Sequence, residues 1–109
     1  GSAELKSEGQ RALYKIAMLV RDKVPAVAVE GHTDSVPLAG GMYRNNWGLS
    51  SMRAAVVADY LETAGGIDPL KLQAVGFASY QPIVPNDSPE HRALNRRVDL
   101  VFLSQYPKR

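Results

Sequence analysis

Two opposite charges lie where a strand end and a helix would meet. Asp34 follows Gly31-His32-Thr33 at the end of an apolar segment, and Arg53 lies within a later segment of helical periodicity. A carboxylate and a guanidinium in one cleft suit a zwitterion, a ligand with an ammonium and a carboxylate on one carbon, because the planar guanidinium binds both carboxylate oxygens. From spacing alone, an internal pair between Asp34 and Arg53, or a turn capped by Asp34, is the more common outcome.

The neighbouring segments are expected to bring these two side chains together. The sequence predicts a strand over 26–32 and a loop over 33–45, and then a helix over 47–64 with Asn46 as its N-cap. A strand end and the start of the helix that follows it can share one edge of an α/β sheet. Loops of this length often carry function.

The remaining segments complete an alternating pattern. A helix is expected over 4–23, a strand over 72–77, a loop over 80–87, a short helix from Ser88-Pro89 to Asn95, and a strand over 98–103. Gly65-Gly66 ends the second helix, because one glycine supplies a left-handed cap. This order predicts an α+β sandwich with helices packed on one face of a sheet. The core side of the second helix is expected to comprise Leu49, Met52, Val56, Tyr60 and Ala64, joined by Val57 and Leu61.

Composition narrows the classes of function. A length of 109 residues fits a single domain over 1–109, and a formal charge of +2 without a dense basic face argues against nucleic-acid binding. The absence of cysteine excludes disulfides and thiolate metal sites. No apolar stretch approaches the roughly 20 residues of a membrane span, and no signal peptide is evident.

Catalysis and metal binding are weakly indicated. His32, Asp34 and His91 are the residues from which a zinc hydrolase would have to be built, but nothing in the sequence brings them together. His32 is interpreted as a buried, hydrogen-bonded residue. No serine lies in a nucleophile motif, and no glycine-rich phosphate loop is present. We therefore expect no enzyme activity, no metal and no cofactor.

Five motifs, in order along the chain, resemble those of the OmpA-like peptidoglycan-binding family. They are Gly31-His32-Thr33-Asp34, Asn46-x-x-Leu49-Ser50-x-x-Arg53, Val75-Gly76-Phe77, Pro82 with Asn86, and Asn95-Arg96-Arg97-Val98. The resemblance implies a β/α/β/α/β-β mixed sheet whose first strand is truncated here, with residues 1–3 as its remnant, unless Gly1-Ser2 is a cloning scar. It implies a site for the diaminopimelate of the wall peptide, whose amine and carboxylates are received by Asp34 and Arg53. Thr33, Asn46, Leu49 and Arg97 match other positions of the same groove.

The resemblance also implies a setting for the parent protein. Within the family, the segments Val36-Pro37-Leu38, Asn46-Trp47 and Pro85–Glu90 are similar to the periplasmic domains of MotB-type flagellar stator subunits. A homodimer in the periplasm is then expected, belonging to an inner-membrane protein that has a channel partner subunit. Two alternatives remain: an anchor of a type VI secretion or outer-membrane protein, and a module whose main role is oligomerisation.

Overall fold

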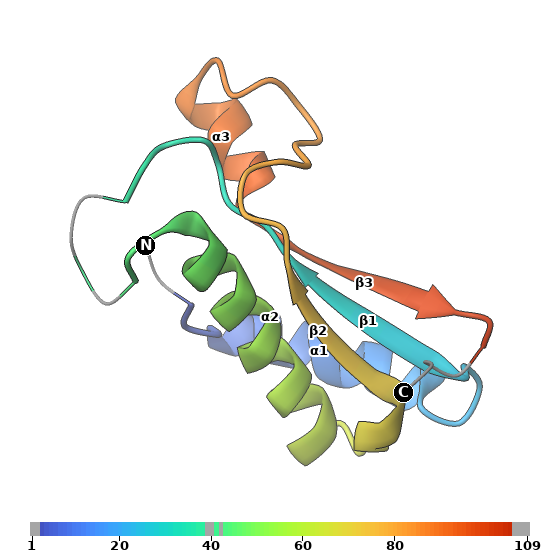
Figure 1. Cartoon of the computed structure of the whole chain (residues 1–109). Coiled ribbons are helices and arrows are strands. Elements are labelled where there is room, and N and C mark those ends of the chain that lie inside the picture. The colour runs from blue at the N-terminus through green and yellow to red at the C-terminus, as the bar shows by residue number, and fades with distance from the viewer. Residues whose placement is uncertain (1–2, 39–40, 42, 106–109) are drawn as a thin grey trace.

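The centre of the molecule is a mixed sheet of three strands in the order β2-β1-β3. The structure is a computed structural model that describes residues 3–38, 41 and 43–105 (Figure 1). β1 (Ala26–Gly31) lies in the middle, parallel to β2 (Leu72–Gly76) and antiparallel to β3 (Val98–Leu103). Each strand lies within the segment in which the sequence predicted it.

Two long helices cover one face of this sheet. α1 (Ser7–Val20) and α2 (Asn46–Thr63) lie on the same side of the three strands, while the short α3 (Pro89–Asn95) lies beyond the end of the sheet (Figure 1). A single 3-10 turn, Pro69–Lys71, leads into β2. The expected mixed sheet with helices packed on one face is confirmed. Among the described residues, no helix combines the length and the apolar character needed to cross a membrane.

Glycines in two strands allow α2 to lie directly on the sheet. A Cβ atom on Gly31 would overlap the backbone carbonyl of Ser50, and one on Gly76 would overlap the side chain and backbone of Ser51. Only hydrogen fits at these crossing points, so the α2 backbone sits close to β1 and β2. This contact brings the start of α2 to the end of β1, where the predicted site lies.

The core side of α2 differs in part from the one expected. Its buried residues are Leu49, Ser50, Ala54, Val57 and Leu61, whereas Met52 is 42% exposed. The apolar residues of α2 surround the helix, so periodicity alone did not choose a side. The close approach of α2 to the sheet selected the side with the small residues Ser50 and Ala54.

The helix ends agree with their predicted caps, with one correction. Asn45 caps α2, because its side chain accepts a hydrogen bond from the Gly48 amide at 2.9 Å, and the prediction of Asn46 as the cap is wrong by one residue. Ser88 caps α3 as expected, accepting from the His91 amide. Gly66 has the positive φ of 72° that a left-handed helix end requires.

β2 and β3 are the two edge strands of the described sheet. On β3, Val98 and Leu100 pack against the core, whereas Phe102, at the same parity of the strand, is 48% exposed. Residues 3–6, which precede α1, form no strand. The expected remnant of a first strand at residues 1–3 lies mostly outside the described residues.

Candidate functional site

The chain leaves β1 through a segment held on both sides by backbone hydrogen bonds. The His32 amide donates to the Arg97 carbonyl and the Thr33 amide to the Ala78 carbonyl, both at 2.9 Å. The Thr33 hydroxyl donates to the Asp34 carbonyl at 2.9 Å. Thr33 is therefore a buried positioning residue, and Asp34 begins its loop from a fixed point.

Ala78 links this segment to α2. Its amide donates to the buried hydroxyl of Ser50 at 2.9 Å, and its φ of 53° lies in the left-handed region, which residues with a side chain seldom occupy. Such a conformation persists only where its surroundings enforce it. Through Ser50 and Thr33, Ala78 joins the start of α2 to the end of β1.

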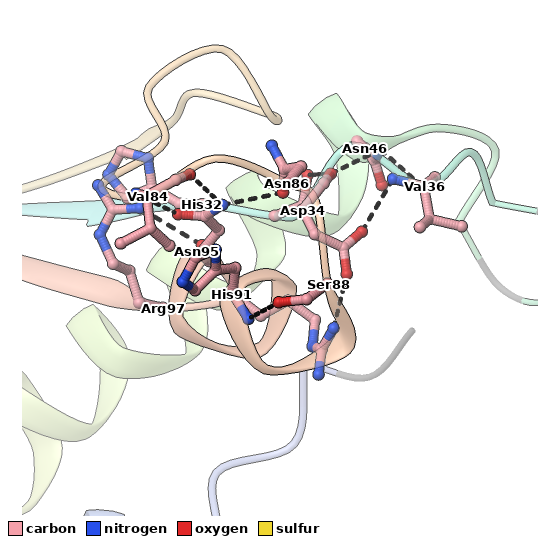
Figure 2. A network of polar contacts seen from close by, with 12 residues as sticks. His32, Asp34, Val36, Asn46, Val84, Asn86, Ser88, His91, Asn95 and Arg97 are labelled. Atoms are coloured by element: carbon pink, nitrogen blue, oxygen red, sulfur yellow. Dashed lines mark hydrogen bonds and ion pairs between the residues drawn. The ribbon is translucent and has the colours of Figure 1, made fainter.

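The Asp34 carboxylate is oriented by two donors. Oδ1 accepts from the Val36 amide at 3.0 Å, and Oδ2 lies 2.6 Å from Nη1 of Arg96. Figure 2 shows Asp34 between Asn46 and Val36 on one side and α3, marked by Ser88 and His91, on the other. The side chain of Asp34 is 12% exposed, so a negative charge is held in a fixed position at the edge of a cleft.

Asn46 closes the loop over Asp34. Its side-chain amide donates to the Val36 carbonyl at 3.1 Å and to the Asp34 carbonyl at 3.4 Å (Figure 2). Asn46 therefore supports the loop that carries the carboxylate from the first turn of α2.

Arg53 approaches the site from the second turn of α2. Its Nη1 donates to the His32 carbonyl at 3.0 Å. Burial lowers the pKa of the Arg53 guanidinium below its usual value, the nearby Arg96 lowers it further, and Asp34 acts in the opposite sense. Because burial is the largest of these effects, a ligand carboxylate that pairs with the Arg53 guanidinium would compensate for its lost hydration.

A cleft of about 470 Å³ joins these side chains. It has one acidic residue, Asp34, and three arginines, Arg53, Arg92 and Arg96, in its lining. The other lining residues are apolar or neutral: Thr33, Val36, Pro37, Leu38, Asn46, Leu49 and Pro89. The cleft can therefore hold a ligand with one cationic and several anionic groups, against an apolar wall.

Comparison with known proteins gives the family of this fold. The model of the OmpA family matches residues 1–96. The chain belongs to the OmpA family. The resemblance to this family that the five sequence motifs indicate is therefore confirmed.

Individual OmpA-like proteins show how widely the domain is used. Peptidoglycan-binding protein ArfA of Mycobacterium tuberculosis is 41% identical over 81% of this chain and 27% of its own length. The C-terminal domain of Helicobacter pylori MotB superimposes with a TM-score of 0.88 at 30% identity, over 95% of this chain and 80% of that one. The cell wall anchor of the T6SS from Pseudomonas aeruginosa gives 0.85 at 38% identity, over 95% and 72%. This chain spans less than half the length of the curated relatives it matches.

The cleft contains five of the six residues proposed from the sequence. Thr33, Asp34, Asn46, Leu49 and Arg53 line it together. Arg97 is placed elsewhere: its Nε donates to both Asp99 oxygens at 3.1 and 3.2 Å, and its Nη2 donates to the Gln81 carbonyl. Arg97 lines a neighbouring cavity under the segment that precedes α1.

Sequence reasoning missed the two arginines that take this place in the cleft. Arg92 lies in α3 and Arg96 is the C-cap of that helix, four residues further on, and the Arg96 side chain pairs with Asp34. Their spacing was a usable signal. The cleft that these two arginines face could not be predicted, because the position of α3 depends on the loop over 80–87.

His32 is buried as expected but does not make the expected ring hydrogen bonds. It is 1% exposed, and among the described residues neither ring nitrogen makes a hydrogen bond of good geometry, although Nε2 lies 3.4 Å from Asp99 Oδ2. The ring stacks on Phe77 with centroids 5.4 Å apart. Burial lowers the pKa of His32, as does Arg97, while Asp99 and Glu30 raise it less. The neutral imidazole is therefore favoured.

Proposed function

We propose that residues 1–109 form one peptidoglycan-binding domain that anchors a larger protein to the cell wall without catalysis. The observation that carries this proposal is the cleft in which Asp34 is opposed by Arg53, Arg92 and Arg96. Membership of the OmpA family and similarity to a peptidoglycan-binding protein and to a cell wall anchor support it.

The ligand we propose is the diaminopimelate of the wall peptide. Its free ammonium is received by the Asp34 carboxylate, where it competes with Arg96 for Oδ2. Its carboxylate is received by Arg53, where it reduces the repulsion between that guanidinium and Arg96. Charge-assisted hydrogen bonds of this kind contribute about 1.5–3 kcal/mol each, which suits a reversible anchor.

The proposal is tested by sedimentation of the domain with purified diaminopimelate-type sacculi. Arg53→Ala and Asp34→Asn are each expected to weaken binding at least about tenfold, because each removes one charge-assisted contact. Arg11→Ala and Asp59→Asn remove the same charges from exposed helix positions and serve as matched controls. If the wild type binds sacculi and both cleft variants bind equally well, the peptidoglycan-binding site lies outside this cleft.

The identity of the peptide is tested by competition. A soluble stem peptide ending in meso-diaminopimelate is expected to release the domain from sacculi. The same peptide with L-lysine at that position lacks the side-chain carboxylate and is expected to compete at least about tenfold less well. Equal competition by both peptides would overturn the diaminopimelate assignment and leave wall binding intact.

We also propose that the parent protein is a flagellar stator subunit of the inner membrane, with a channel partner and this domain in the periplasm as a homodimer. The similarity to H. pylori MotB supports this assignment. The similarity to the P. aeruginosa T6SS anchor favours the alternative that the parent belongs to a secretion system. Arg53→Ala in the parent is expected to abolish swimming of cells that retain their flagella; a secretion defect in motile cells would favour the alternative.

The absence of catalysis is part of the proposal. Incubation of the domain with sacculi is expected to release no soluble muropeptides, with or without a chelator. Release that a chelator abolishes would instead indicate a metal-dependent wall hydrolase.

A further inference from the structure

A second group of polar side chains lies on the face of the sheet opposite the helices. Gly31 faces α2, so its neighbours Glu30 and His32 point to the other face, because strand side chains alternate. Asp99 on β3 is the register partner of Glu30 and shares that face. Two strands thus bring three metal-ligating side chains together, away from the cleft of the proposed function.

Two features of this group are unfavourable without a further cation. Glu30 and Asp99 are carboxylates directly opposite each other, and like charges in that position destabilise a sheet. His32 has two buried ring nitrogens without a hydrogen-bond partner among the described residues, and an unsatisfied buried polar group costs roughly 1–3 kcal/mol. A cation bound by all three side chains would offset the carboxylate repulsion and give one of the two His32 ring nitrogens a partner.

The spacing of the ligand atoms fits a metal ion. One ligand atom from each of Glu30, His32 and Asp99 lies within 4.8 Å of the others. His32 Nε2 and Asp99 Oδ2 are 3.4 Å apart. Two ligands at about 2.1 Å from a tetrahedral zinc ion are also separated by about 3.4 Å. Glu30 provides the third ligand atom of the set.

We propose that Glu30, His32 and Asp99 form a binding site for a divalent transition-metal ion, with zinc as the best match. Imidazole nitrogen and carboxylate oxygen are both zinc ligands, at about 2.0–2.2 Å from the ion. Arg97 is the competing cation, since its Nε contacts both Asp99 oxygens. Two carboxylates and one guanidinium still leave one negative charge for the metal.

The experiment is calorimetric titration of the metal-free chain with zinc chloride. We expect one ion per chain, with binding weakened at least about tenfold in Glu30→Gln and in Asp99→Asn, and a melting temperature that zinc raises less in these variants than in the wild type. Both substitutions are at partly exposed positions, which keeps the test independent of whether a His32 variant folds.

The other histidine provides the control. His91 Nδ1 lies 2.5 Å from Asp87 Oδ1 on the surface, so His91→Gln with Asp87→Asn removes the second His–carboxylate pair. This double variant is expected to bind zinc like the wild type. No zinc binding by the wild type up to millimolar concentration, or loss of binding in the control alone, would overturn the proposal. Neither result would affect wall binding.

Discussion

Asn95 is the residue that holds the loop over 80–87 against α3. It is fully buried, its Oδ1 accepts from the Ile83 and Val84 amides, and its Nδ2 donates to the Val84 carbonyl and to Asn86 Oδ1 (Figure 2). All four hydrogen-bonding positions of one side-chain amide are used. The position of α3, and with it that of Arg96 in the cleft, depends on this residue.

Asn95→Asp keeps the shape of the side chain and removes both donors. We expect it to lower the free energy of unfolding by more than about 2 kcal/mol, because two acceptors lose their donor and a carboxylate is buried. Asn86→Ala removes only one of these contacts and is expected to cause less than half of that loss. Urea unfolding followed by circular dichroism measures both. Equal effects of the two substitutions would contradict this role of Asn95.

The limits of sequence-based prediction are visible in individual residues. Asp34 and Arg53 were placed correctly because a short path of chain joins a strand end to a helix start, which restricts where both can lie. Arg97 and Arg96 are adjacent, and the sequence cannot tell which of two neighbouring arginines faces a cleft. The register of β3 decides this by directing Arg97 toward Asp99.

At the scale of elements, the contact between α2 and the sheet determines the site. The bounds of α2, α3 and the strands followed closely from capping residues and apolar runs, since those signals are local. α1 spans Ser7–Val20 and is three residues shorter at each end than the expected helix over 4–23. The buried side of α2 did not follow from local signals, because it depends on Gly31 and Gly76, which belong to other elements. The buried side of α2 is therefore determined by glycines on the strands and not by the periodicity of the helix itself.

Gly31→Ala tests this contact. The added methyl group would overlap the Ser50 carbonyl, and we expect a loss of about 3 kcal/mol or more of unfolding free energy, because helix backbone cannot move aside as a side chain can. Gly48→Ala is the matched control: its Cβ would lie 3.7 Å from Asn45 Oδ1, and stability is expected to be unchanged or to rise by up to about 1 kcal/mol. Thermal melting of both variants checks the pair. A Gly31→Ala protein as stable as the Gly48→Ala protein would contradict the close-contact interpretation.

At the scale of the whole molecule, binding to the wall is expected to depend on salt. The chain has a net charge of +2, and three arginines line the cleft. Raising the salt concentration from about 0.1 M to 1 M shortens the Debye length from about 10 Å to 3 Å. Sedimentation with sacculi is therefore expected to decrease steadily over this range, and an unchanged bound fraction would indicate that apolar contacts dominate instead.

The edge of β3 is the surface on which we expect two copies of the chain to meet. Phe102 is 48% exposed there, and it borders an apolar cavity of about 700 Å³ between α1 and β3 whose lining includes Leu13, Ile16 and Leu100. An edge strand beside apolar surface pairs readily with another strand, and burying one phenylalanine contributes about 1.5–3 kcal/mol. Phe102→Lys is thus expected to raise the dissociation constant of the proposed homodimer at least about tenfold.

Analytical ultracentrifugation over a range of concentrations measures this effect. Leu70→Lys replaces another exposed apolar residue, 64% exposed and next to the start of β2, and serves as the control. If the control dissociated the dimer and Phe102→Lys did not, the interface would lie on the β2 side of the sheet. A lysine on the edge of β3 leaves the cleft lining unchanged, so a monomeric Phe102→Lys protein also shows whether one copy is enough to bind sacculi.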